Sequence, residues 1–236
     1  GVGFLPRPAD GVLSVTAQTL RIDFISDVAC PWCVVGLRSL LQALDSLGDD
    51  VRAEIRFQPF ELNPNMAPEG ENTFEHVQKK YGSTPERSAA AREALNQSGE
   101  ALGFVFNYGP EPRIWNTFDA HRLLHWAGIE GKQLALKQAL FKSNFTDQRP
   151  TNDPDALADA VRDAGLDPDR ARAILASDEF ADEVRAEEQH WRANGINAVP
   201  SVIFNQRWLI QGGQPPQVFE HAIRDILSGN AREASV

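Results

Sequence analysis

The sequence predicts an α/β protein in which a mixed sheet is divided by a long helical segment. Residues 20–26 and 51–60 are rich in β-forming residues, and apolar residues with helical spacing lie between them. Residues 65–194 show helical periodicity broken repeatedly by glycine and proline. Short strand patterns return at 201–205 and 208–211, and a final helix follows. The expected order is strand–helix–strand, a helical block, then strand–strand–helix.

The first helix is expected to begin at Cys30 and to run to about Leu47. Pro31 suits its first turn, where a missing N–H costs nothing, and Gly48 ends it. Its apolar residues recur at helical spacing, namely Val34, Leu37, Leu40, Leu41 and Leu44.

Five to seven helices are expected between residues 65 and 194. Thr84 before Pro85 has the pattern of an N-cap followed by a first helical residue, and similar starts occur at Asp153-Pro154 and Asp167-Pro168. The last two strands are separated by the turn-like Gln206-Arg207, and the final helix spans Pro216–Leu227.

Composition narrows the classes of function. The chain has 236 residues and a formal net charge of −10, so nucleic acid is not expected as a main partner. No stretch reaches the roughly 18–20 apolar residues of a membrane span, so no membrane partner is expected. The first twenty residues lack a cationic segment followed by an apolar one, which favours a cytoplasmic location.

Cys30-Pro31-Trp32-Cys33 contains the chain's two cysteines and is its most informative motif. Thiols at i and i+3 meet across one helical turn, and the first lies where unpaired N–H groups and the helix dipole favour a thiolate. The second can then resolve a mixed disulfide. A structural zinc site would need more ligands than this pair, while an inert or structural pair remains an alternative. The motif predicts dithiol–disulfide chemistry.

The chain resembles the DsbA family, in particular its FrnE-like branch, which is related to 2-hydroxychromene-2-carboxylate isomerases and kappa-class glutathione transferases. The resemblance rests on the Cys-Pro-Trp-Cys motif together with the segments Phe60–Pro64, Asn116–Leu123, Gly195–Phe204 and Ile210–Gln214. It implies a thioredoxin fold, with a βαβ…ββα mixed sheet, carrying a large all-helical insertion.

The resemblance also implies a domain organisation. A mobile lead-in covers 1–19, the N-terminal half of the thioredoxin fold 20–64, the helical insertion 65–194, the C-terminal half 195–230 and a tail 231–236. Some FrnE-like proteins carry an additional cysteine pair near the C-terminus, which this chain lacks. Activities that need a second dithiol are therefore not expected.

The resemblance assigns roles to individual residues. Cys30 and Cys33 would be catalytic, and Val199–Pro200 would form a cis bond beside them, with Val199 offering its backbone to substrate. Independently of the resemblance, the positions of Asp27, Pro31 and Trp32 beside the cysteines predict that they modulate the thiols, and Asp27 is alternatively a turn-forming residue. Asn116 and Thr117 would line a substrate groove or, alternatively, cap a helix.

Other side chains have simpler interpretations. His121 and His125 lie at i and i+4, a metal-ligand spacing, but no third ligand is near in sequence, so no metal site is expected. Trp115 is interpreted as packing, and the acidic run 178–188 as a solvated helix face.

The sequence thus predicts a thiol–disulfide oxidoreductase or isomerase, acting on protein or small-molecule thiols and disulfides as a monomer or homodimer. It needs no cofactor, although glutathione is a candidate co-substrate. The alternative is a glutathione-dependent isomerase or transferase acting on a small aromatic molecule in a pocket formed by the inserted helices. A third class is a holdase-like binding protein.

Overall fold

The computed structural model describes residues 17–232 and contains a four-stranded mixed sheet. The strand order is β2-β1-β5-β6, in which β1 and β2 are parallel and the other neighbours are antiparallel. The strands are β1 (Gln18–Ser26), β2 (Val51–Pro59), β5 (Ser201–Phe204) and β6 (Trp208–Gln211). Strand β1 begins two residues earlier than the predicted boundary, and residues 1–16 of the predicted lead-in lie outside the described residues.

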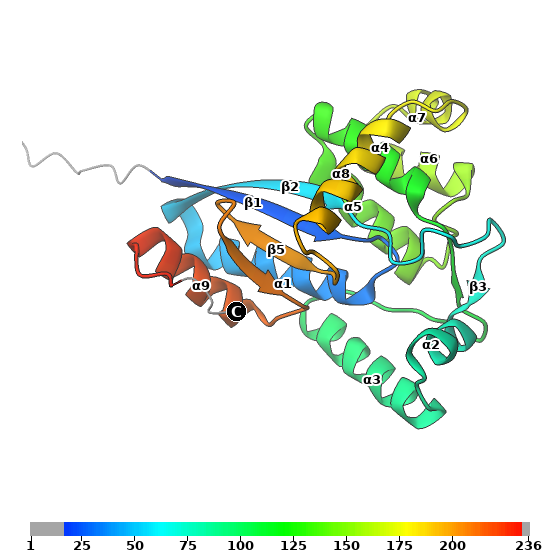
Figure 1. The fold of residues 1–236 in the computed structure, drawn as a ribbon, viewed down its shortest axis with the longest axis horizontal. Helices are drawn as coiled ribbons and strands as arrows, with labels where there is room; N and C mark the ends of the chain where they lie inside the picture. The colour runs from blue at the N-terminus through cyan, green and yellow to red at the C-terminus, as the bar shows by residue number, and fades with distance from the viewer. Residues whose placement is uncertain (1–16, 233–236) are drawn as a thin grey trace, which may run out of the picture.

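Successive side chains of β1 point to opposite faces of the sheet. Leu20, Ile22 and Phe24 are fully buried in a core formed with α1 (Pro31–Leu47) and α9 (Pro216–Ser228). Figure 1 shows these two helices beneath the strands. On the opposite face, Ile25 packs in a smaller cluster with Phe60.

The segment between β2 and β5 is mainly helical, as predicted. Its α-helices are α2 (Thr73–Tyr81), α3 (Pro85–Ala101), α4 (Phe118–Ile129), α5 (Gln133–Phe141), α6 (Pro154–Asp163), α7 (Pro168–Leu175) and α8 (Ala181–Ala193). The side chains of Thr84, Asp153 and Asp167 each accept a hydrogen bond from a backbone N–H of the first turn. The three predicted helix starts are therefore confirmed, each with proline at the first position.

The insertion is not entirely helical. Glu71–Asn72 (β3) and Arg113–Ile114 (β4) pair as a small antiparallel sheet. Each strand has two residues, which is too short to show the alternation on which strand prediction depends. This pair holds α2 next to the segment that leads into α4.

Helices α4 to α7 form a second hydrophobic core, to which Val28 from the turn before α1 also belongs. It includes Leu123, Trp126, Leu136 and Val161, which are at most 4 % exposed. Figure 1 shows helices α4–α8 grouped at the upper right, and α2 and α3 at the lower right. None of the helices within residues 17–232 has the length and apolarity of a membrane-spanning segment.

Candidate active site

The Cys-Pro-Trp-Cys motif lies where β1 passes into α1. A turn closed by the Cys30 N–H and the Asp27 carbonyl oxygen, 3.1 Å apart, places Cys30 at the N-cap of α1, and Pro31 follows as a first-turn residue. Both cysteines are free thiols and hydrogen-bond to each other. Cys30 keeps 5 % exposure whereas Cys33 has none, so Cys30 is the thiol that a substrate can reach.

The Val199–Pro200 segment faces this thiol pair. Its peptide bond is cis, as the resemblance implies, and the Val199 carbonyl oxygen accepts a hydrogen bond from Cys30 Sγ over 3.8 Å. Helix α1 packs directly on the proline ring, because a Cβ built on Gly36 would lie 3.0 Å from Pro200 Cγ. Two segments whose bonded residues are 169 positions apart in the chain thus form one site.

Asp27 is a buried carboxylate below the motif. Its Oδ2 accepts the Leu62 N–H at 2.9 Å, and its Oδ1 lies 3.2 Å from His121 Nε2. Burial by itself raises the pKa of Asp27, but the hydrogen bonds and charge of His121, with bonds from Leu62 and Thr117, outweigh it and leave the pKa lowered. Asp27 therefore forms the turn through its backbone and also places a negative charge near the thiols.

Cys33 lies in an environment that disfavours its thiolate. Burial, followed by the hydrogen bond and negative charge of Cys30, raises the pKa of Cys33 well above its usual value. The ammonium group of Lys137, which is 1 % exposed, acts in the opposite direction. Lys137 was not identified from the sequence. The available signal was its position between Leu136 and Leu140 on a helix that has no other charged residue.

Glu61 and Glu188 form a buried pair of carboxyl groups near Asp27. They are 5 % and 6 % exposed, so the prediction that the acidic run 178–188 is a solvated face is wrong at Glu188. Helix α8 turns this residue inward together with Val184, one turn earlier. Burial and the neighbouring Glu188 carboxyl raise the pKa of Glu61 to about 8, and burial raises that of Glu188. The pair therefore holds a proton at neutral pH.

This pair predicts that stability falls as pH rises. An unfolded Glu61 loses its proton near pH 4.5, whereas the folded one keeps it until about pH 8, so the free energy of unfolding declines between these values. We expect a loss of about 1–2 kcal/mol after allowance for solvent screening. Urea denaturation at several pH values measures it. Glu61→Gln is expected to flatten this slope, and an unchanged slope in that variant contradicts the assignment.

A cavity of about 370 Å³ opens beside the motif, between α2, α3 and the loops before α4 and α6. Its wall includes Pro31 and four aromatic side chains, Phe74, Tyr108, Trp115 and Phe145. Burial raises the pKa of Tyr108 to about 12, so the phenol stays protonated at physiological pH. The cavity can hold a small apolar or aromatic group next to Cys30.

The residues that were expected to line a substrate groove lie elsewhere. Asn116 and Thr117 do not line this cavity. Asn116 bonds to the Met66 carbonyl oxygen and the Phe118 N–H, while Thr117 is 3 % exposed and bonds to Asp27. Trp115, interpreted as packing, instead forms part of the cavity wall. Sequence could not separate these neighbours, because their orientations depend on the turn into α4.

The two histidines of α4 have separate partners. His121 pairs with Asp27, and His125 Nδ1 lies 3.3 Å from Glu187 Oε1. In the part of the chain that the structure describes, no group of three His, Cys, Asp or Glu side chains is placed to hold a metal ion.

Gly213, in the Ile210–Gln214 segment on which the family resemblance partly rests, packs closely against the Cys-Pro-Trp-Cys motif. A Cβ at this position would lie 3.0 Å from the Trp32 carbonyl oxygen and 2.9 Å from Trp32 Cε3. Gly213→Ala is therefore expected to displace the motif, lowering stability by about 1–3 kcal/mol and slowing reactions at Cys30. Urea denaturation and thiol alkylation rates measure both effects, and wild-type values for both would contradict the close contact.

Comparisons with known proteins agree with this architecture. A family model described as DSBA-like thioredoxin domain matches residues 21–224. The uncharacterized protein YwbO of Bacillus subtilis is 26% identical over 212 residues, which cover 88% of this chain and 98% of that protein.

Solved structures give the same result. A probable DsbA oxidoreductase from Streptomyces coelicolor has a TM-score of 0.81 and 32% identity, with 92% of this chain and 93% of that chain covered. The cytosolic disulfide reductase DsbM from Pseudomonas aeruginosa, determined with GSH, shares the fold at a TM-score of 0.61 and 14% identity, with 88% and 99% covered. Because the family model spans most of the chain and the Streptomyces relative exceeds 30% identity over nearly all of both chains, this protein belongs to the family of DSBA-like thioredoxin-domain oxidoreductases.

Proposed function

We propose that this protein is a DsbA-type thiol–disulfide oxidoreductase that uses its Cys-Pro-Trp-Cys dithiol. The observation that carries the proposal is the unequal placement of the two free thiols: Cys30 is reachable at the start of α1, and Cys33 is enclosed one turn later. A thiol at the surface can attack a substrate, whereas a buried thiol can react only with the mixed disulfide that this attack forms.

The chemistry proceeds in two balanced steps. The Cys30 thiolate attacks one sulfur of a substrate disulfide, forms a mixed disulfide and releases the other sulfur as a thiolate. Cys33, after losing its proton, attacks Cys30 Sγ and releases the second substrate thiolate. The substrate gains two electrons and the protein becomes the Cys30–Cys33 disulfide. The reverse sequence oxidises a dithiol substrate.

The surrounding residues have supporting roles in this proposal. Val199 and Pro200 would align an extended substrate, because the Val199 carbonyl oxygen already faces Cys30 Sγ at 3.8 Å. Pro31 and Trp32 would contact the substrate flanking its sulfur, and the buried Asp27 carboxylate would influence protonation of the thiols.

The cavity beside Pro31 supports a small-molecule substrate or co-substrate. Its aromatic lining would hold an apolar group attached to the reacting sulfur, and glutathione is the candidate thiol that regenerates the site. DsbM, a disulfide reductase of the same fold, is described as cytosolic, and we place the activity of this protein in the cytoplasm as well.

Equilibration against glutathione and insulin reduction together test the proposal. We expect the wild-type pair to exchange with glutathione at a potential between about −270 and −120 mV, the range of related dithiols. We also expect it to accelerate the reduction of insulin by a small thiol. A pair that neither equilibrates nor accelerates reduction would show that the site is not a redox centre.

The aromatic lining of the cavity favours a second candidate, a glutathione-dependent isomerase or transferase acting on a small aromatic molecule. Under that function glutathione binds saturably, and activity survives Cys33→Ser because no resolving thiol is needed. Calorimetric titration with glutathione, followed by product analysis of that variant with aromatic substrates, separates the two candidates.

A further inference from the structure

Strand β2 forms one edge of the main sheet, and part of that edge is open. The backbone groups that point away from β1 are identified at Phe57, whose N–H donates to Gln133 Oε1 over 2.9 Å and whose carbonyl oxygen accepts from Gln133 Nε2 over 3.4 Å. Successive residues of a strand point these groups to opposite sides, so Ala53 and Ile55 also point theirs outward. In the described part of the chain, no hydrogen bond reaches the outward groups of these two residues. The Gln133 amide thus takes the place of a neighbouring strand at Phe57 only.

A groove of about 630 Å³ runs beside this open edge. Its lining includes Ala53 and Ile55 of β2, Ile129 at the end of α4 and Leu134 at the start of α5. The Ile129 side chain is 65% exposed. A strand edge with unpaired N–H and C=O groups is a template for pairing with another strand, and the apolar residues beside it would be covered by that pairing.

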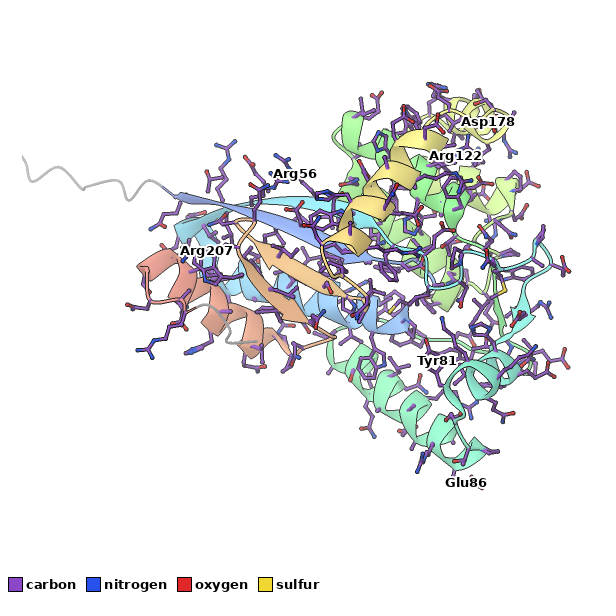
Figure 2. All side chains as sticks on the ribbon, viewed as in Figure 1. Arg56, Tyr81, Glu86, Arg122, Asp178 and Arg207 are labelled. Atoms are coloured by element: carbon purple, nitrogen blue, oxygen red, sulfur yellow. The ribbon has the colours of Figure 1, made fainter. Side chains whose placement is uncertain are left out.

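Charged residues alternate in sign along the same stretch. Asp50, Arg52, Glu54 and Arg56 are all exposed, and their charges run negative, positive, negative, positive. Arg56 lies beside Asp23 in the strand register, on the face opposite to the one that α1 and α9 cover, and Figure 2 labels it above the strands. Within residues 17–232, none of the four charged residues of this stretch forms an ion pair. The open edge therefore presents a row of alternating charges to a pairing strand.

We propose that β2 pairs antiparallel with β2 of a second copy of this chain, about a two-fold axis at Ala53. In this register Ala53 lies opposite Ala53 of the partner subunit, and Val51 lies opposite Ile55 of the partner subunit. Arg52 lies opposite Glu54 of the partner subunit, and the two-fold symmetry forms that pair twice. The edge is therefore complementary to itself in both apolar contacts and charge.

The pairing ends where the edge is already occupied. The outward backbone groups of residues 51–55 bond across the axis, whereas Phe57, which Gln133 holds, faces no strand residue of the second copy. Asp50, in the turn before β2, lies opposite Arg56 of the partner subunit, which adds a further pair of opposite charges.

The alternating charges disfavour the neighbouring registers. Moving the axis by one residue, to Arg52 or to Glu54, places that residue opposite its own copy, and like charges directly opposite each other are destabilising. Moving the axis to Ile55 places Ala53 opposite Phe57, whose backbone groups are bonded to the Gln133 amide. Of these registers, the one centred on Ala53 satisfies both the charges and the backbone.

Sedimentation velocity over a range of concentrations tests the pairing in the full chain. We expect a reversible dimer for the wild type. Arg52→Glu and Glu54→Arg each place like charges opposite each other at two positions, so each is expected to raise the Kd of the dimer by about tenfold to a hundredfold at low salt. Glu100→Arg is the matched control, because it makes the same change of charge as Glu54→Arg at an exposed residue of α3, and its Kd should match that of the wild type.

Mixing the two variants tests the register. In a heterodimer the two introduced residues face each other with opposite signs, and the native Arg52–Glu54 pair remains at the second position. The variants differ in mass, so native mass spectrometry distinguishes the heterodimer from either homodimer. We expect the heterodimer to predominate in the mixture, and a mixture that remains monomeric would contradict the register.

Hydrogen exchange of the wild type provides a test that needs no variant. We expect the Ala53 and Ile55 amides to be protected more strongly at high protein concentration than at low, whereas the Phe57 amide, already bonded to Gln133, should exchange equally at both. Protection of Ala53 and Ile55 that does not change with concentration would show that a segment of the same chain covers the edge, and would contradict the proposal. A wild type that stays monomeric, or a dimer whose Kd both single variants leave unchanged, would likewise overturn it.

Discussion

Replacing Cys30 with serine is expected to abolish disulfide exchange, lowering the rate by about 10³-fold or more, as when other enzymes lose their nucleophile. Serine preserves the shape of the N-cap but provides no thiolate, and the remaining Cys33 is fully buried. Insulin reduction and release of the coloured thiolate from a symmetric nitrobenzoate disulfide measure the loss.

Cys33→Ser is the matched variant, and a different result is expected. Cys30 remains reachable and attacks as before, but the mixed disulfide cannot be resolved within the chain. Intact-mass analysis should therefore find the substrate thiol bound to Cys30. The proposed division of roles fails if Cys30→Ser retains exchange, or if Cys33→Ser turns over without accumulating the adduct.

Arg122→Met is expected to cause the largest loss of stability among single substitutions of charged residues. The guanidinium is 4 % exposed and donates to the carbonyl oxygens of Ile174 at 2.7 Å and Glu179 at 2.9 Å, and also to that of Ser177. It also pairs with Asp119 at 3.0 Å. Figure 2 labels Arg122 near Asp178, in the group of helices at the upper right.

Removing this guanidinium takes donors away from carbonyl oxygens in the segment that follows α7, leaves Asp119 without this partner and empties a buried position, although the Ile174 carbonyl oxygen keeps its bonds from the Ser177 N–H and Oγ. We expect a cost of about 3–5 kcal/mol, or a decrease of roughly 6–20 °C in Tm for a chain of this length. Arg224→Met provides the control, because that arginine is 56% exposed and pairs with Glu220 on one helix. Calorimetry measures both, and a similar small decrease in the two variants would contradict the structural role.

Local sequence signals predicted most of the framework. The helix starts at Pro85, Pro154 and Pro168 depend on a capping side chain followed by a residue with a fixed φ angle, and both are readable within four residues. Strand β1 was predicted from its alternating residues, and the missed pair β3 and β4 is too short for any alternation.

The buried charged residues were not predicted, because a charged residue in a sequence is ordinarily expected to lie at the surface. Glu188 lies in an acidic run, and only the packing of α8 against the sheet directs it toward Glu61. Lys137 is one lysine among helical residues until α5 places its amine over the Phe57 ring. Likewise, Asp27 and His121 are 94 residues apart in the chain and pair only because α4 packs against the sheet, in contact with β2.

The dithiol, and the exchange chemistry proposed for it, could be predicted from the sequence. Two cysteines three positions apart at a helix start meet across one turn whatever surrounds them. Tertiary structure alone decided what surrounds that pair: the Val199 carbonyl oxygen, the enclosed amine of Lys137, the Asp27–His121 pair and the aromatic cavity beside Pro31. The reason is that desolvation and electrostatic interaction depend on distances between residues far apart in the chain, which no local pattern records.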